Sequence, residues 1–184
     1  MTDEDLILQW RHGDHTAGEQ VVCSYSKRIY GFVRAMVGGH ADAQDVTQEV
    51  FVKIWRHLRR FDHRKSAKAW IFKIARTTAL DALKKKKTVP FSDLENEDGE
   101  SVVDAIIDPA PLPSEWFDDK EKIRRVTSMV ELLPLRYRVV LQLRYGDDLT
   151  FREIAEVLGE PLDTVKSRHL RGVAQIKKLL KIDT

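Results

Sequence analysis

Cysteine is almost absent from this 184-residue sequence. Cys23 stands alone, which excludes an intramolecular disulfide and any metal site built on a CxxC pair. Long apolar runs are missing too, and no stretch approaches the ~20 apolar residues that a helix needs to cross a bilayer. Residues 1–15 are acidic and lack both a basic leader and an apolar core, so they do not form a signal peptide. These absences predict a cytoplasmic chain without membrane insertion.

The motifs of common enzyme sites are missing as well. The sequence has no glycine-rich phosphate loop and no HExxH, and its six histidines are scattered. No nucleophile with a partner base stands out. We therefore expect no catalytic residue, no metal, no cofactor and no small-molecule substrate, which makes an enzyme the weakest class of function.

What is present is a globular composition, with 42% hydrophobic and 33% charged residues. The net charge of +2 hides a strong asymmetry along the chain. Residues 1–88 carry +7, residues 89–121 carry −10 and residues 122–184 carry +5. Two basic blocks around a short acidic one favour binding of a polyanion by the flanks.

Residues 89–114 are predicted to be an extended acidic linker. This stretch holds four of the six prolines, and Pro109, Pro111 and Pro113 remove amide donors and favour extended backbone. The alternative is a surface loop within one domain, although a loop of this length is unusual in a compact domain. The linker divides the chain into domains at residues 1–88 and 115–184.

The N-terminal block has helical periodicity throughout. Helices are predicted over residues 3–12, 16–37, 42–60 and 66–87, with Asp42 capping the third and Gly38 and Gly39 ending the second. Apolar residues at spacings of three and four form a stripe in the third helix: Val46, Val50, Phe51, Ile54, Trp55 and Leu58. The fourth helix turns another set inward: Trp70, Ile71, Ile74, Ala75, Thr78 and Leu83. No strand-like alternation occurs, so the fold class is all-α.

The C-terminal block contains the pattern of a helix-turn-helix in "LTFREIAEVLGEPLDTVKSRHLRG", residues 149–172. Thr150 and Glu153 form a capping box, Gly159 ends the first helix, and a second helix follows over about 162–181. Residues 126–146 supply two further helices for the core of this domain.

The first half of the second helix is polar and basic, as expected of a helix that enters the major groove. Thr164, Ser167 and Arg171 share one face, where an arginine can bind guanine. Lys166 and Arg168 can hold phosphates. The alternative, an ordinary helical hairpin with a solvated basic face, accounts for this segment alone but not for both basic blocks.

Three segments of the sequence match known motifs. "DAQDVTQEVFVKIW" resembles the signature D-A-x-D-x-x-Q-E-x-F-x-x-x-W, and "SAKAWIFKIARTTALDALKKKK" resembles the block W-[LI]-[FY]-x-I-A-x-N-x-x-x-D-x-x-R. "LLPLRYRVVLQLRYGDDLTFREIAEVLGEPLDTVKSRHLRG" resembles a C-terminal block that ends in T-V-K-S-R. Together the three segments resemble the bacterial extracytoplasmic-function (ECF, group IV) RNA polymerase sigma factors of the sigma-70 family. The resemblance covers nearly the whole chain outside the linker.

The resemblance implies a transcription initiation factor that binds core RNA polymerase and promoter DNA, with an anti-sigma factor as a further partner. The residues matching the family's polymerase contact are Asp45, Gln48 and Glu49. Those matching its minus-ten segment, which opens DNA and holds a flipped base, are Phe61, Arg64, Lys65, Trp70, Lys73, Arg76 and Thr77. Those in its minus-thirty-five segment are Thr164, Lys166, Ser167, Arg168, Leu170 and Arg171. The linker is implied to thread through polymerase channels.

Some of these residues have a second interpretation. The acidic residues of the third helix also suit a solvated surface, and Phe61 and Trp70 also suit a hydrophobic core. Three positions depart from the family pattern: Thr77 replaces an asparagine, His169 and Leu170 are exchanged, and Gly172 replaces an alanine. We expect His169 to lie partly in the core, hydrogen-bonded. The other function considered is a conventional helix-turn-helix regulator that binds DNA without polymerase, which leaves the N-terminal helices without a role.

Overall fold

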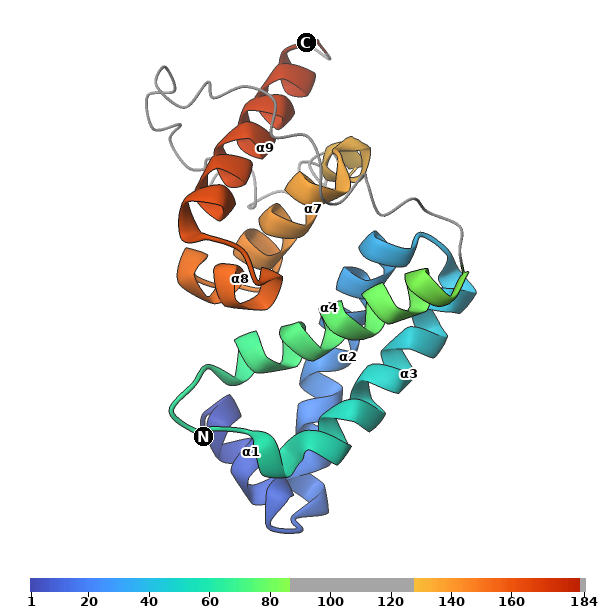
Figure 1. The fold of residues 1–184 in the computed structure, drawn as a ribbon, viewed down its shortest axis with the longest axis vertical. Helices are drawn as coiled ribbons and strands as arrows, with labels where there is room; N and C mark the ends of the chain where they lie inside the picture. Colours follow the sequence, from blue (N-terminus) through green and yellow to red (C-terminus); the bar gives the residue numbers. More distant parts are fainter. Residues whose placement is uncertain (87–127, 183–184) are drawn as a thin grey trace.

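The computed structural model describes residues 1–86 and 128–182, which form helices and no strand (Figure 1). The N-terminal part comprises α1 (Asp3–Arg11), α2 (His15–Val37), α3 (His40–His57), a 3-10 turn (Leu58–Arg60) and α4 (Ala67–Lys86). In the C-terminal part residues 128–132 are helical, and α7 (Leu135–Leu141), a π-helical segment (Gln142–Gly146), α8 (Phe151–Leu158) and α9 (Leu162–Ile182) follow. The all-α fold is confirmed. The predicted linker, 89–114, lies outside the described residues.

Local sequence sets several helix ends. At α1, the Thr2 amide donates to Asp5 Oδ2 at 2.9 Å, and the Asp5 amide donates to Thr2 Oγ1 at 3.2 Å. The predicted capping box of α8 forms in the same way, with the Thr150 amide 2.7 Å from Glu153 Oε2 and the Glu153 amide 3.3 Å from Thr150 Oγ1. Gly159 ends α8 in the left-handed conformation, at φ +64°. Both boundaries of α8 are therefore confirmed.

The predicted start of α3 is wrong. The helix begins at His40, two residues before the expected cap Asp42, and its N-cap Gly39 provides no side-chain hydrogen bond. Gly38 ends α2 with φ +81°, so the chain passes from α2 into α3 almost at once and leaves no room for a longer connection. Asp42 lies in the first turn of α3, where its charge still favours the positive helix end.

The N-terminal helices enclose an apolar core to which α2, α3 and α4 each contribute. Tyr25, Phe32, Ile54 and Phe72 are at most 1% exposed. Phe72 meets Phe32 edge to face, with ring centroids 5.3 Å apart, a favourable geometry for two aromatic rings. Phe72 was not among the residues that we expected to face inward, although it is more completely buried than Trp70.

In the C-terminal part, α7 packs closely on α9. A Cβ atom at Gly172 would lie 3.0 Å from Leu141 Cδ1 and 3.3 Å from Tyr137 Cβ. Both neighbours belong to a buried cluster that also contains Leu133, Val173 and Ile176. The glycine thus permits a close approach of two helices, which offsets its intrinsic helix penalty of about 1 kcal/mol.

The two parts of the chain also pack against each other. Helix α4 lies along α8, and α2 contacts α7 (Figure 1). The buried apolar residues of α2, α3 and α4 form one continuous cluster with residues from the C-terminal part, among them Val140, Leu143, Ile154 and Val157. The described helices therefore share one core across this interface.

Removal of the α8 cap tests how local sequence stabilises this arrangement. We expect Thr150→Ala to lower the free energy of unfolding by about 1 kcal/mol, because the amide of Glu153 loses its acceptor. Thr150→Ser retains the hydroxyl and serves as the control. Urea unfolding followed by circular dichroism measures both, and equal midpoints for wild type and Thr150→Ala would contradict the role of the cap.

Candidate nucleic-acid interface and docking surface

Helix α3 presents an outer face that combines acidic and apolar side chains. Asp45, Gln48, Val52 and Trp55 follow at helical spacing on this face, and all four are exposed. Trp55 is 61% exposed and Val52 44%, values that are high for large apolar side chains in a folded chain. We call these four residues, together with the half-buried Glu49, the α3 docking face.

The predicted inward position of Trp55 is wrong, and this tryptophan instead belongs to the α3 docking face. Trp55 was expected in the inward stripe with Val50 and Ile54, but those two are fully buried whereas Trp55 points to the opposite side. The helical spacing of Trp55 from Asp45 and Val52 indicates that it lies on the acidic outer face. The prediction relied instead on the apolar character of tryptophan and placed it in the core. Glu49 Oε1 lies 3.1 Å from Lys53 Nζ, so part of its charge is already compensated.

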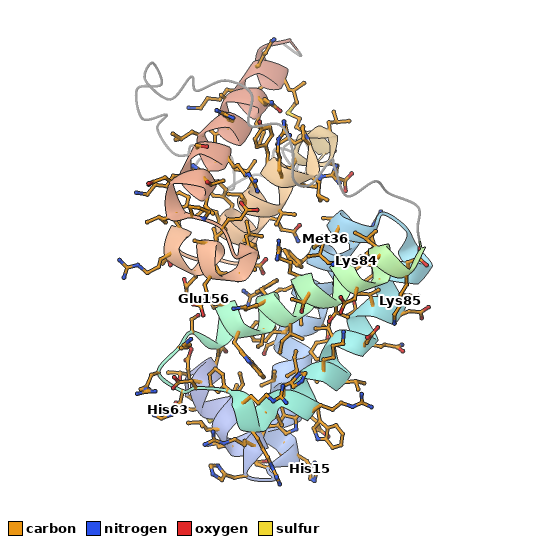
Figure 2. All side chains as sticks on the ribbon, in the orientation of Figure 1. His15, Met36, His63, Lys84, Lys85 and Glu156 are labelled. Atoms are coloured by element: carbon orange, nitrogen blue, oxygen red, sulfur yellow. The ribbon has the colours of Figure 1, made fainter. Side chains whose placement is uncertain are left out.

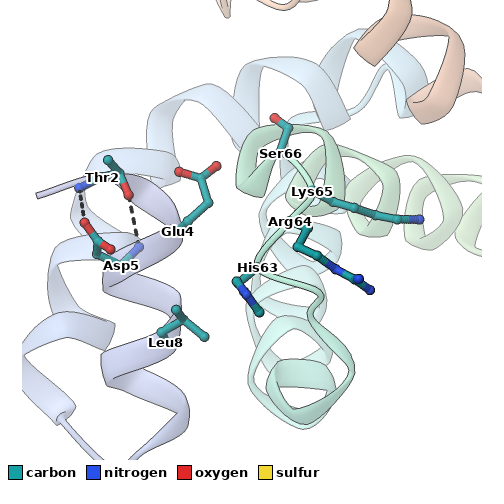
Figure 3. A pocket seen from close by; sticks show the side chains of 8 residues that line it. All are labelled: Thr2, Glu4, Asp5, Leu8, His63, Arg64, Lys65 and Ser66. Atoms are coloured by element: carbon teal, nitrogen blue, oxygen red, sulfur yellow. Dashed lines mark hydrogen bonds between the residues drawn. The ribbon is translucent and has the colours of Figure 1, made fainter.

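A pocket opens between the start of α1 and the loop that precedes α4 (Figure 3). Its volume is about 470 Å³, and residues of two segments line it: Thr2, Glu4, Asp5 and Leu8 from α1, and His63, Arg64, Lys65 and Ser66 from the loop. Glu4 Oε1 accepts a 2.8 Å hydrogen bond from the Ala67 amide, which fixes α1 against the first turn of α4. Two segments distant in sequence thus build one pocket.

The loop beside this pocket is held by a compact ion pair. Asp62 Oδ1 accepts from the Arg64 amide at 3.1 Å and from Arg64 Nε at 3.0 Å, and Arg64 Nη2 lies 3.1 Å from Oδ2. These hydrogen bonds lower the pKa of Asp62 to about 2, so the carboxylate stays ionised at neutral pH. The Arg64 side chain nevertheless remains 80% exposed, and the Lys65 side chain is 62% exposed.

The aromatic residues near the loop differ in accessibility. Phe61 is 3% exposed and packs on Trp70 with ring centroids 5.1 Å apart. This burial favours the alternative that Phe61 is a core aromatic, because its ring offers no free face. Trp70 is half-buried and keeps part of its surface open.

Helix α4 continues this surface with polar residues. Lys73 and Thr77 are exposed one turn apart, and the Thr77 hydroxyl is 3.0 Å from the carbonyl oxygens of Lys73 and Ile74. The threonine hydroxyl proton is thus already used within the helix. Arg76 faces another direction and is half-buried, and this burial lowers its pKa, with the nearby Arg168 adding to the effect.

The helix-turn-helix of α8 and α9 confirms the predicted pair of helices. On α9, Lys166 is exposed, while Thr164, Ser167 and Arg171 are half-buried. Ser167 Oγ donates to the Thr164 carbonyl oxygen at 3.3 Å. Arg168 Nη1 lies 2.8 Å from Glu160 Oε1, so this arginine is engaged within the protein.

His169 lies in the core, as expected from its exchange with Leu170. It is 6% exposed, and its Nε2 is 3.0 Å from the Tyr145 hydroxyl oxygen. The imidazole stacks on Tyr145 at 5.6 Å and meets Phe151 edge to face at 4.9 Å. Leu170, in turn, is half-buried and lies outside this aromatic group.

Two classes of site receive no support from the described residues. In the ranges 1–86 and 128–182, no helix combines the length and hydropathy needed to span a membrane. Across the same ranges, no three histidine, cysteine, aspartate or glutamate side chains are grouped to hold a metal ion.

Comparison with known proteins assigns both parts of the chain. The family model "Sigma-70 region 2" matches residues 21–89, and "Sigma-70, region 4" matches residues 123–176. The ECF RNA polymerase sigma factor SigW of Bacillus subtilis is 30% identical over 95% of each chain. The RNA polymerase sigma-H factor of Pseudomonas aeruginosa is 31% identical over 97% of this chain and 94% of its own.

Solved structures show the same fold. CnrH, in complex with the cytosolic domain of CnrY, superposes with a TM-score of 0.67 at 24% identity over 99% of both chains. The sigma factor RpoE from Bartonella quintana, in complex with the anti-sigma factor NepR, gives 0.63 at 21% identity, covering 90% of this chain and 98% of that one. With the two region matches and the full-length relatives, the chain belongs to the ECF sigma factors of the sigma-70 family.

Proposed function

We propose that this sigma factor, which directs RNA polymerase to promoters and is not an enzyme, works through three separate surfaces. Residues 1–88 supply the polymerase-docking and minus-ten surfaces, residues 115–184 supply the minus-thirty-five surface, and residues 89–114 connect them. The observation that carries the proposal is that one chain places an apolar docking face, a basic loop with a pocket and a helix-turn-helix in the order of the two matched regions.

The α3 docking face suits the core polymerase. Binding energy in protein interfaces concentrates in a few large side chains, with tryptophan prominent among them, inside a polar rim. Trp55 and Val52 provide the apolar centre, and Asp45, Gln48 and Glu49 provide a rim of hydrogen-bond acceptors and negative charge. We infer that this face binds a basic helical surface of the polymerase.

The pocket beside the loop suits an unstacked base of the minus-ten element. A flipped base needs a concave site, polar groups for its edge and cations for the displaced strand. Ser66, Thr2 and Glu4 supply the polar groups, and Arg64 and Lys65 supply exposed cations at the rim. Trp70, Lys73, Arg76 and Thr77 extend this surface along α4, whereas Phe61 supports it from the core.

The first half of α9 suits duplex DNA of the minus-thirty-five element. Arg171 is assigned to a base edge, together with Thr164 and Ser167 on the same face. Lys166 and Arg168 are assigned to phosphates, and Leu170 to a thymine methyl group. Because RNA polymerase and its templates are cytoplasmic in bacteria, the chain is placed in the cytoplasm.

An anti-sigma factor is proposed as a further partner. The similar solved structures contain CnrH in complex with the cytosolic domain of CnrY and RpoE in complex with the anti-sigma factor NepR. A protein that covers the α3 docking face would prevent polymerase binding without altering the fold.

Transcription in vitro tests the proposed function. Purified chain plus core polymerase should start transcripts at a small set of sites in a library of fragments from the source genome, and core polymerase alone should not. Duplex binding by the isolated chain together with no new transcripts in the presence of core would instead support a conventional helix-turn-helix regulator.

Filling the pocket tests base capture. We expect Leu8→Trp to slow promoter opening about tenfold, because a stacked base contributes ~1–3 kcal/mol and the indole would occupy its place. Leu8 lines the pocket on α1 and is far in sequence from the α3 docking face, so affinity for core polymerase should stay unchanged. Permanganate footprinting measures opening, with Leu8→Met as the control. Normal opening by Leu8→Trp would mean that the base binds elsewhere.

A further inference from the structure

Three aromatic rings from three different elements meet behind the first half of α9. Tyr145 comes from the π-helical segment, Phe151 from the first turn of α8, and His169 from α9 itself. Figure 2 shows Glu156 on the side of α8 that faces α4, whereas Phe151 meets the His169 imidazole, with ring centroids 4.9 Å apart. His169 Nε2 and the Tyr145 hydroxyl oxygen are 3.0 Å apart and form a hydrogen bond. A directional polar contact thus lies within the packing between these elements.

The backbone around Tyr145 and Phe151 holds their two rings in place. Arg144 Nη1 donates to the Leu149 carbonyl oxygen at 3.1 Å, and the Leu149 amide donates to the Leu143 carbonyl oxygen at 3.0 Å. The Arg144 guanidinium carbon lies 5.3 Å from the centre of the Phe151 ring. These contacts connect the π-helical segment to the start of α8, so the two rings form a platform on which α9 rests.

His169 lies on the opposite side of α9 from the proposed base-reading face, which consists of Thr164, Ser167 and Arg171. At 3.6 residues per turn, position 169 falls about half a turn away from the middle of that face. The exposure of these side chains agrees, because His169 is 6% exposed whereas the base-reading face is half-buried. A contact at His169 therefore sets the direction in which Arg171 points.

Base reading is sensitive to small rotations of a helix. An α-helix with its side chains has a radius of roughly 5–6 Å, so a rotation of ~10° about its axis moves groups at its surface by about 1 Å. The distance between nitrogen and oxygen in a hydrogen bond varies over only about 0.5 Å. A rotation of ~10° is therefore enough to weaken a two-pronged contact between Arg171 and a guanine.

Apolar packing alone does not fix the rotation of α9 so tightly. Hydrophobic contact is non-directional, and cores accept repacked apolar side chains with little loss of stability. A hydrogen bond is directional, and a rotation that separated His169 from Tyr145 would leave the buried imidazole without this partner. In coiled coils a single buried polar residue selects the register for the same reason. The pair is thus suited to align α9 as well as to stabilise it.

We propose that Tyr145 and His169 are positioning residues for promoter recognition, because their hydrogen bond fixes the rotation of α9 and thereby aligns Arg171 with a base edge. The inference rests on the minus-thirty-five surface proposed above and goes beyond it, since neither residue is assigned a contact with DNA. Loss of the hydrogen bond lowers discrimination between base pairs. Contacts with phosphates carry no sequence information, so their loss or gain does not change that discrimination.

Transcription by holoenzyme reconstituted from the full chain and core polymerase measures this alignment. The templates are a preferred promoter, single-base variants of its upstream element, and a version with that element scrambled. Tyr145→Phe removes the hydroxyl and keeps the ring. It should reduce the preference for the intact over the altered base pair about tenfold, the loss expected when one bidentate contact is misaligned. Transcription from the scrambled version should stay unchanged, because it does not depend on base reading.

A double-variant cycle shows whether the two residues act as a pair. His169→Leu removes the hydrogen bond from the other side, and its effect on base preference should match that of Tyr145→Phe. The double variant Tyr145→Phe, His169→Leu should then be no worse than either single variant. His169→Gln, whose amide can still form a hydrogen bond with the Tyr145 hydroxyl, should retain most of the preference.

Ile176→Val is the control for lost stability. Ile176 is fully buried on the second half of α9, and removal of one methylene group there destabilises the packing without breaking a hydrogen bond. This variant should keep the wild-type preference across the promoter panel. Thermal unfolding followed by circular dichroism compares the stability of all the variants.

Each outcome decides the proposal. A wild-type preference in both Tyr145→Phe and His169→Leu overturns it, and so do additive effects in the cycle. An equal loss of transcripts from intact and scrambled promoters also overturns it, because a merely structural role has that effect. If His169→Leu does not fold, Tyr145→Phe and His169→Gln carry the same comparison. Failure of the proposed function is recognised separately, because wild-type holoenzyme would itself show no preference across the single-base panel.

Discussion

Trp55→Ala is expected to weaken binding to core RNA polymerase by about 2 kcal/mol or more, roughly thirtyfold, as for a tryptophan at the centre of an interface. The side chain is 61% exposed on α3, so its loss should leave the free energy of unfolding nearly unchanged. The double variant Asp45→Lys, Glu49→Lys should also weaken binding to core polymerase, because it reverses the negative charge at the rim of the α3 docking face. A titration of labelled chain with core polymerase measures these affinities.

The control for these variants is a charge reversal on another surface. Glu19 is exposed on α2, away from the α3 docking face, and Glu19→Lys should bind core polymerase like wild type. An unchanged affinity for both Trp55→Ala and the Asp45 and Glu49 variant would show that polymerase docks elsewhere. A loss of affinity that is equal in Glu19→Lys would indicate a general effect of charge instead.

Arg171→Ala should lower affinity for the preferred upstream element by about 1–3 kcal/mol and relax the preference at one base pair, because a bidentate arginine reads guanine. Arg171 shares a helix face with Thr164 and Ser167 and lies near the middle of α9, which runs from Leu162 to Ile182. Transcription from a promoter with a scrambled upstream element should fall far less. A panel of single-base promoter variants measures the preference.

Lys166→Ala is the matched comparison on the same helix. Its exposed side chain is assigned to phosphate, so binding should weaken on all sequences alike and the salt slope should fall by about one. If wild type and Arg171→Ala give the same profile across the promoter panel, Arg171 does not read sequence. The assigned face of α9 would then be wrong, although the helix-turn-helix itself would stand.

Local signals in the sequence predicted most of the described helices. The capping box of Thr150 and Glu153 and the glycine at 159 located α8, and the unusual order of His169 and Leu170 predicted a buried histidine. Apolar periodicity was less reliable at Trp55, because hydrophobicity alone does not distinguish a core residue from an exposed residue that binds a partner protein. The polymerase and minus-ten roles of individual residues came from the resemblance, whereas the base and phosphate roles on α9 came from the helix-turn-helix pattern. All of them stay predictions.

Contacts between distant segments could not be predicted in this way. Arg28 and Asp147 are 119 residues apart in sequence. No motif around either residue indicates that the two form an ion pair. The pocket likewise needs α1 to lie against the loop before α4, an arrangement to which the hydrogen bonds from the Ala67 amide to Glu4 and from Arg11 to the Phe61 carbonyl oxygen contribute. A flipped base requires a pocket, but the sequence did not indicate that α1 would form one wall of it.

The position of α1 has a practical consequence for work with the purified protein. Thr2, Glu4 and Asp5 stand at the pocket, so an affinity tag fused ahead of Met1 would emerge beside the proposed base-binding site. The far end of α9 lies at the opposite end of the molecule from α1 (Figure 1). A tag placed after α9 therefore leaves the pocket clear, and promoter-opening rates measured with the two tagged forms should differ while their polymerase affinities agree.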